Sequence, residues 1–155
     1  RFLRSLRRAA AVGVPVYAEC GGLMLLAREL RVGGRAVPMA GVLDLEVGQF
    51  PTPQGHGYVV ASVEADTPFF PAGTVLRGHE FHYSSVLGGK DATATVANLS
   101  RGQGLGDGRD AVVRRNVWAS YFHVHASGCP QWAEGLVAAA RGRRPGYHGS
   151  AVGWG

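Results

Sequence analysis

The pattern of apolar and polar positions predicts a helix at the start of the chain, followed by a short buried strand. Leu3, Leu6 and Ala10 share one face of a 3.6-residue period, with the arginines mostly elsewhere, as in an amphipathic helix. Val14 to Glu19 is an apolar run rich in β-forming residues and predicts a strand. A tight turn follows it, and Leu23 to Leu26 then has helical spacing.

Short β-like runs, separated by turns that glycine and proline mark, fill most of the remaining chain. A closing helix is predicted over Gln131 to Arg141, and a loose, glycine-rich tail over Gly142 to Gly155. This spacing fits antiparallel strands and hairpins appended to a parallel α/β core. The runs are Gly41–Phe50, His56–Glu64, Val75–Val86, Ala92–Leu99 and Ala111–Val124.

The predicted strand over Val14 to Glu19 ends at Cys20, and Gly21 and Gly22 come directly after it. A nucleophile between a strand and a helix is the pattern of a nucleophile elbow, in which small neighbours leave room for a substrate. The same position places the thiol at a helix N-terminus, where unpaired N–H groups favour the thiolate. By itself the segment fits equally a buried cysteine at the end of a strand.

Two histidines close a second run of aromatic and β-branched residues, far along the chain. Ala119 to His125 predicts a strand that carries His123 and His125. A nucleophilic cysteine needs a base, which is usually distant in sequence and adjacent in space. Positions i and i+2 of a strand share a face, so either histidine fits this role. Alone they fit exposed surface groups better, but together with the elbow at Cys20 they favour a base.

Three segments, in this order and at similar separations, carry a resemblance to a known family. They are Tyr17–Met24 (YAECGGLM), Arg77–Ser84 (RGHEFHYS) and Ala119–His125 (ASYFHVH). The chain resembles the glutamine amidotransferase domain of the cobyrinic acid a,c-diamide synthases, from about Val14 to about Ala140. The resemblance implies an α/β fold, the flavodoxin-like fold of class I (triad-type) glutamine amidotransferases, with a parallel core and appended antiparallel strands.

The resemblance also implies roles for individual residues. Cys20 becomes the nucleophile that attacks the side-chain amide of glutamine, His123 its base, and the N–H of Gly21 a donor to the oxyanion. Many triad-type amidotransferases carry a glutamate two residues after the histidine, where this chain has a histidine. A Cys–His dyad with no acid is equally allowed, so what orients the base stays open. The groups that remain as orienting partners are Glu80, Glu19 and His125.

The second segment of the resemblance is crowded with polar and aromatic side chains. A strand that buried so many polar groups without partners would be unstable, so we expect part of the segment to line a pocket. A strand with one solvated face is the alternative. The residues expected to bind glutamine are His79, Glu80, His82 and Tyr83.

The expected domain organisation is a partial amidotransferase domain over residues 1–141 and a tail over 142–155. The chain begins inside a predicted helix and contains only one predicted parallel strand, which has too few neighbouring strands to be buried on both sides. We therefore expect the chain to be the C-terminal part of a longer protein. The resemblance implies an upstream ATP-binding synthetase domain that uses ATP and Mg²⁺, and no cofactor or metal ligand in this one. The expected partners are glutamine, a corrin acceptor reached through the synthetase domain, and a second copy in a homodimer.

Composition excludes two other classes of function. The 155 residues carry a net charge of +5, but the basic residues are spread along the chain without interleaved aromatic residues or zinc-ligand spacing. This distribution argues against binding of nucleic acid. No apolar run approaches the roughly 20 residues of a membrane-spanning helix. Two cysteines far apart in sequence indicate a reducing compartment, so we expect a cytoplasmic protein.

The resulting prediction is the glutaminase half of an ATP-dependent cobyrinic (or hydrogenobyrinic) acid a,c-diamide synthase. It would hydrolyse glutamine through a cysteine thioester and supply ammonia for amidating corrin side chains a and c in cobalamin biosynthesis. Three alternatives stay open: an amidotransferase for another acceptor such as nickel-sirohydrochlorin, a non-catalytic interaction domain, and a metal-binding domain. The side chains available to such a metal are Cys20, His79, His82, His123 and His125.

Overall fold

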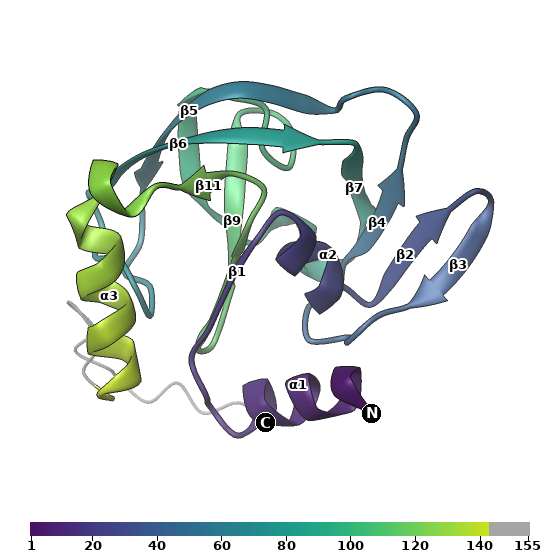
Figure 1. Ribbon diagram of the computed structural model, residues 1–155, viewed down its shortest axis with the longest axis horizontal. Coiled ribbons are helices and arrows are strands. Elements are labelled where there is room, and N and C mark those ends of the chain that lie inside the picture. The colour runs from purple at the N-terminus through teal and green to yellow at the C-terminus, as the bar shows by residue number, and fades with distance from the viewer. Residues whose placement is uncertain (143–155) are drawn as a thin grey trace.

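Two β-sheets and three α-helices make up residues 1–142, the part of the chain that the computed structural model describes (Figure 1). The helices are α1 (Phe2–Ala11), α2 (Gly21–Leu26) and α3 (Pro130–Ala140). The strands are β1 (Val16–Glu19), β2 (Glu29–Val32), β3 (Arg35–Pro38), β4 (Glu46–Gln49), β5 (Gly55–Val63), β6 (Val75–His82), β7 (Ser84–Gly88), β8 (Thr95–Arg101), β9 (Arg109–Arg114), β10 (Val117–Ser120) and β11 (His123–Val124). The predicted tail, apart from Gly142, lies outside the described residues.

The seven-stranded sheet contains the parallel pairing that the sequence predicts. Its order is β1-β10-β9-β8-β5-β6-β11, and β1 runs parallel to β10 with Glu19 opposite Ser120. The other neighbours in this sheet pair antiparallel. The N–H of Val124 on β11 donates a hydrogen bond to the side chain of Glu19 on β1. The two outermost strands of the sheet order therefore meet at this carboxylate.

The predicted β-like run Ala111–Val124 contains three strands, β9, β10 and β11, and the strand predicted over Ala119–His125 is interrupted between β10 and β11. β9 ends at Arg114, and Arg115, with a φ of 54°, begins the tight turn into β10. The chain then leaves β10 and crosses to the other end of the sheet, where β11 pairs with β6 and places His123 opposite His79. This return brings the second and third segments of the resemblance side by side (Figure 1).

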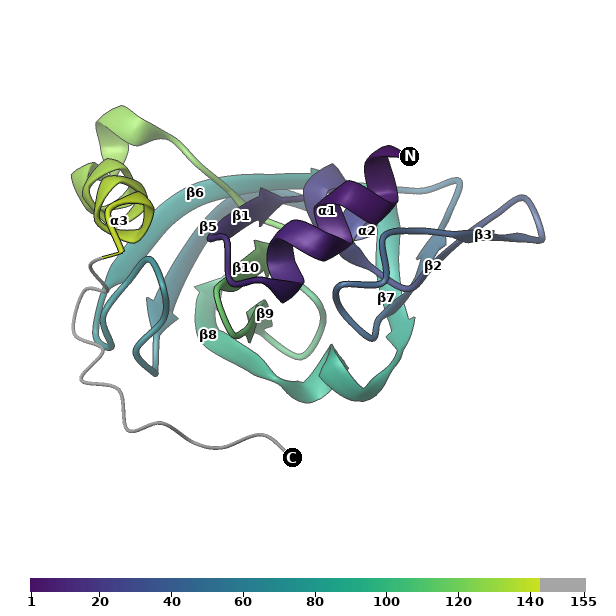
Figure 2. The same cartoon turned by 90° about the horizontal axis from the view of Figure 1, so that it is seen from below.

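The four-stranded sheet has the order β3-β2-β4-β7 and contains a hairpin that the hydrophobic pattern misses. β2 and β3 pair across Gly33 and Gly34, whose φ values of 55° and 75° suit a two-residue turn. The hairpin projects from the rest of the molecule (Figure 2), and β3 is exposed throughout. The predicted run Val75–Val86 is also divided, because β6 and β7 belong to different sheets.

Two hydrophobic clusters form the core. Ala10 is buried in the first, and Leu3 and Leu6 pack against it, which confirms the predicted apolar face of α1. The second cluster contains Trp118 and is covered by α3 through Trp132 and Leu136. Within residues 1–142, no helix has the length and apolar character needed to cross a membrane.

Candidate active site

Cys20 occupies the turn between β1 and α2 in a strained backbone conformation. Its φ of 47° and ψ of −102° are values that residues other than glycine rarely adopt. The N–H of Cys20 donates to the carbonyl of Ser120 at 2.7 Å, which continues the parallel pairing of β1 with β10 up to the turn. The sheet thus holds the strain in place, and the geometry is that of a strand-to-helix elbow with the side chain at its tip.

The two glycines after Cys20 have different physical roles. A Cβ atom on Gly22 would lie 3.1 Å from the Cβ of Ala18, so a glycine there lets α2 pack closely on β1. A Cβ atom on Gly21 would meet nothing nearer than the end of Met24 at 4.0 Å, so the space beside the thiol is open. The glycines therefore both tighten the elbow and leave room in front of Cys20.

The electrostatic environment of Cys20 favours the thiol. Burial raises the pKa of the Cys20 thiol above its ordinary value, and the charges of Glu19 and Asp110 raise it further. The N–H of Gly21 acts in the opposite direction, because it hydrogen-bonds to the sulfur. The predicted stabilisation of the thiolate at the start of α2 is thus outweighed by burial, and a nucleophile at this position needs a neighbouring base.

Of the three orienting partners that the sequence left open, Glu19 is the one that contacts His123. The Nδ1 atom of His123 lies 3.2 Å from Oε2 of Glu19, while Oε1 of the same carboxylate accepts the N–H of Val124 at 3.0 Å. An ionised carboxylate only accepts hydrogen bonds, which assigns the proton to Nδ1 and leaves the lone pair of Nε2 free. A histidine held in this tautomer can accept a proton from a thiol.

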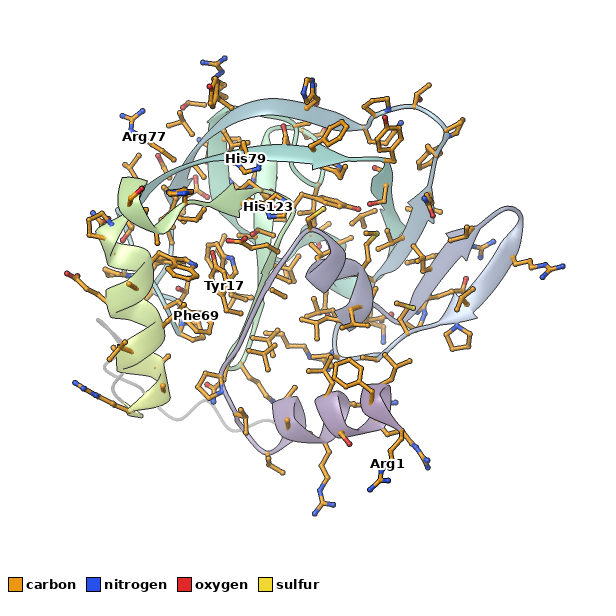
Figure 3. The ribbon with its side chains drawn as sticks, in the orientation of Figure 1. Arg1, Tyr17, Phe69, Arg77, His79 and His123 are labelled. Carbon is orange, nitrogen blue, oxygen red and sulfur yellow. The ribbon has the colours of Figure 1, made fainter. Side chains whose placement is uncertain are left out.

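Strand β6 lies alongside both Cys20 and His123. The rings of His79 and His123 stack with their centroids 5.1 Å apart (Figure 3), and Sγ of Cys20 lies 4.0 Å from the carbonyl oxygen of Phe81. His79 and Phe81 are two residues apart, about 7 Å along a strand. The elbow and the histidine therefore adjoin the same short stretch of β6.

Glu80 and His82 lie on the inner face of β6, away from His123. Glu80 is buried and accepts the N–H groups of Gln103 at 2.6 Å and Gly104 at 2.9 Å, with Nε2 of His82 at 3.4 Å. Burial by itself raises the pKa of Glu80, but the hydrogen bonds from His82, Gln103 and Gly104 together hold it below its ordinary value. Nδ1 of His82 binds the carbonyl of Ser84 at 2.7 Å. Both side chains are thus engaged in the interior.

The other predicted site residues lie toward the surface. His79 is exposed, and Tyr83 is 40% exposed with its ring edge against Phe81. His125 follows β11, is exposed, and its Nδ1 atom lies 2.7 Å from the hydroxyl of Ser127. Of the predicted residues, Glu19 and His79 contact His123, and Cys20 directly follows Glu19 along the chain. Among residues 1–142, no group of three or more His, Cys, Asp or Glu side chains could hold a metal ion.

The chain matches the model of the CobB/CobQ-like glutamine amidotransferase domain over residues 1–130. It belongs to that family. Cobyrinate a,c-diamide synthase of Magnetococcus marinus is 37% identical to this amidotransferase domain over 135 residues, 87% of this chain and 29% of that protein. The enzyme of the same name from Halobacterium salinarum is 39% identical over 124 residues, 79% of this chain and 28% of that protein. The chain thus spans less than a third of the length of these relatives.

Two solved structures have a similar fold. A crystal structure of a glutamine amidotransferase superposes with a TM-score of 0.63 at 21% identity, covering 90% of this chain and 68% of that one. PurLQS from Thermotoga maritima gives 0.60 at 17% identity, covering 88% and 65%. At these identities the likeness concerns the fold, and it confirms the predicted α/β amidotransferase fold.

Sequence reasoning missed two residues that support the site of this amidotransferase domain. Asp110 is fully buried and accepts the N–H groups of Tyr121 and Phe122, the two residues before His123. Tyr17 donates its hydroxyl to Glu19 at 3.0 Å. The available signal for Asp110 was a charged residue directly before the apolar run from Ala111. The signal for Tyr17 was its position two residues before Glu19 on the same strand.

Proposed function

We propose that the chain is the glutaminase part of a cobyrinate a,c-diamide synthase, with Cys20 as nucleophile, His123 as base and Glu19 as the residue that orients the base. The observation that carries this proposal is the Glu19–His123 hydrogen bond directly beside a strained elbow cysteine. Family membership supports glutamine as the substrate of the site, and the names of the relatives support a corrin acceptor.

The first half of the reaction transfers the acyl group to sulfur. Nε2 of His123 takes the proton of the Cys20 thiol, and the sulfur attacks the side-chain amide carbon of glutamine. The amide oxygen becomes an oxyanion, which the N–H of Gly21 stabilises from its place beside the sulfur. His123 then returns its proton to the nitrogen, the C–N bond breaks, and ammonia leaves a thioester on Cys20.

The second half regenerates the enzyme. His123 takes a proton from a water molecule, the resulting hydroxide attacks the thioester carbon, and glutamate leaves as the sulfur recovers its proton. Throughout both halves the imidazole must keep Nδ1 protonated. The bond to Glu19 provides for this, because the carboxylate stabilises the imidazolium that forms in each half.

We assign recognition of glutamine to the outer side of the segment around β6. His79 and Tyr83 reach the surface next to the elbow and the base, so they suit contact with a small polar substrate. The burial of Glu80 and His82, and their bonds to the loop at Gln103 and to the carbonyl of Ser84, favour a supporting role beneath that surface. The segment would thus bind substrate on one face and fix the strand on the other.

The ammonia would be used by a synthetase domain elsewhere in the same protein. The relatives are more than three times as long as the matched region, which leaves room for such a domain. We propose that it uses ATP and Mg²⁺ to activate the a and c carboxylates of a corrin. In this arrangement residues 1–141 are its amidotransferase domain, and this domain itself binds no cofactor.

The test is covalent labelling of the complete synthase by 6-diazo-5-oxo-norleucine, a glutamine analogue that alkylates amidotransferase nucleophiles. We expect a single adduct on Cys20 by peptide mass spectrometry, blocked by excess glutamine and absent in Cys20→Ser. Cys129, also a free cysteine, provides the internal control and should stay unlabelled. A folded synthase that shows no adduct, or one that releases glutamate at an unchanged rate after Cys20→Ser, would contradict the proposal.

A further inference from the structure

The carboxylate of Glu19 has a third hydrogen-bond donor besides His123 and Val124. The hydroxyl of Tyr17 donates to Oε1 at 3.0 Å, the same oxygen that accepts the N–H of Val124, whereas His123 binds Oε2. Tyr17 and Glu19 are two residues apart on β1 and therefore point to the same face of the strand. With Oε1 engaged twice, rotation of the carboxylate away from His123 would break two hydrogen bonds.

The ring of Tyr17 is enclosed by other aromatic rings, so its hydroxyl has little freedom to move. It stacks on Trp118 at a centroid distance of 6.2 Å and an interplanar angle of 4°. Phe69 at 5.3 Å and Trp132 of α3 at 6.0 Å meet it edge-on. Figure 3 shows Tyr17 beside Phe69, on the side of β1 that faces α3, with His123 beyond it. The ring therefore serves as a fixed support.

The hydroxyl stays protonated over the working range of the enzyme. Burial raises the pKa of Tyr17, and the negative charge of Glu19 raises it further. A donor that cannot ionise is well suited to hold a carboxylate, because its hydrogen bond persists whenever Glu19 is charged. The phenol does not reach the reacting sulfur or the imidazole, so any effect it has on the chemistry passes through Glu19.

From this chain of contacts we infer that Tyr17 is a positioning residue, which fixes Glu19 so that His123 keeps the orientation and tautomer needed to activate Cys20. The inference rests on the proposed glutaminase function and adds to it a residue that contacts neither substrate nor nucleophile. It also gives α3 a part in the site, because Trp132 belongs to the aromatic enclosure of Tyr17.

The test is the kinetics of glutamine hydrolysis by the complete synthase with Tyr17→Phe, which removes the hydroxyl and keeps the ring. We expect kcat to fall about tenfold, the effect of losing one hydrogen bond to a charged group, with the KM for glutamine changed less than twofold. Tyr58→Phe removes the same atom from a tyrosine on β5 that is 70% exposed, and should leave both constants unchanged. Equal thermal unfolding midpoints of wild type and variant establish that folding is intact.

A double-mutant cycle separates action through Glu19 from a general packing effect. The rate of Cys20 labelling by 6-diazo-5-oxo-norleucine is measured in wild type, Tyr17→Phe, Glu19→Ala and the double variant. We expect Tyr17→Phe to slow labelling in wild type and to add less than twofold in the Glu19→Ala background. An unchanged kcat in Tyr17→Phe, or the same tenfold loss in both backgrounds, overturns the inference. A wild-type synthase that neither hydrolyses glutamine nor reacts at Cys20 refutes the proposed function instead.

Discussion

Gly78 is the residue whose substitution most directly tests the placement of His123. It lies on β6 opposite Val124, next to the pair His79–His123. A Cβ atom added to Gly78 would lie 2.0 Å from the carbonyl oxygen of His123, which is backbone and cannot rotate away. The conformation of Gly78 does not itself require glycine, because its φ is outside the left-handed region. Gly78→Ala therefore acts through the close approach of β11 alone.

The size of the displacement follows from that contact. Real Cβ atoms almost never approach another heavy atom closer than 3.0 Å, so β11 must move away from β6 by about 1 Å. A shift of this size would move His123 relative to Glu19 and disturb the geometry of their 3.2 Å contact. Misplacing a catalytic group by 1 Å costs about 100-fold in rate. We therefore expect kcat/KM for glutamine hydrolysis to fall about 100-fold in Gly78→Ala.

The assay is glutamate release by the complete synthase over a range of glutamine concentrations, together with the rate of Cys20 labelling. Gly88→Ala is the matched control, because Gly88 also lies in a strand and a Cβ there would meet nothing within 4 Å. Its kinetics should be those of wild type. Circular dichroism and thermal unfolding of both variants show whether the folded structure survives.

One outcome would refute this reasoning. If Gly78→Ala is folded and hydrolyses glutamine within twofold of wild type, then either β11 does not lie against β6 as described or His123 is not the base. The labelling rate decides between these two. Unchanged labelling after His123→Ala would remove the histidine from the mechanism, whereas strongly slowed labelling would place the error in the strand geometry.

Two buried carboxylates yield further predictions about stability. Burial raises the pKa of Asp110 to about 7, against about 3.9 in the unfolded chain. The contribution of Asp110 to stability is therefore complete below about pH 4 and is lost as the pH rises through 7. The free energy of unfolding of wild type, measured relative to that of Asp110→Asn, should fall by on the order of 4 kcal/mol over that range. Urea unfolding at each pH measures this, and a constant difference would contradict it. Glu80→Ala should destabilise the fold by about 2–4 kcal/mol, because it strips an acceptor from the N–H groups of Gln103 and Gly104, and Glu80→Gln, which keeps one oxygen, should lose less in the same measurement.

The local pattern of the sequence was sufficient to predict the elbow and the helices. An apolar β-forming run, one cysteine and two glycines specify a strand, a tight turn and a helix within a few residues, and β1 and α2 have this order. The amphipathic face of α1 was predictable for the same reason. The β2–β3 hairpin was overlooked, because each of its strands has only four residues and β3 is exposed throughout, although Glu29 to Val32 alternates between charged and apolar residues and Gly33–Gly34 follows it.

The choice between Glu19 and Glu80 as the partner of His123 could not be made from the sequence. Successive residues of a strand point to opposite faces, so His79 and Glu80 cannot both point toward His123. Which of them does depends on the pairing of β6 with β11, a contact between segments more than 40 residues apart in sequence. The register places His79 opposite His123 and turns Glu80 inward to the loop at Gln103. Long-range register is not encoded in any local pattern.

Glu19 and Cys20 are consecutive, and this changes which movements can disturb the proposed triad. A carboxylate one residue before the nucleophile shares its backbone, so the pairing of β1 with β10 fixes both at once. His123 is the one member that arrives from elsewhere, on a two-residue strand held by β6 on one side and by Glu19 on the other. Asp110 accepts hydrogen bonds from the N–H groups of Tyr121 and Phe122, the two residues that precede that strand. In the proposed triad, the position of β11 therefore determines whether His123 can activate Cys20. Displacing β11 should impair this activation while leaving the elbow itself intact.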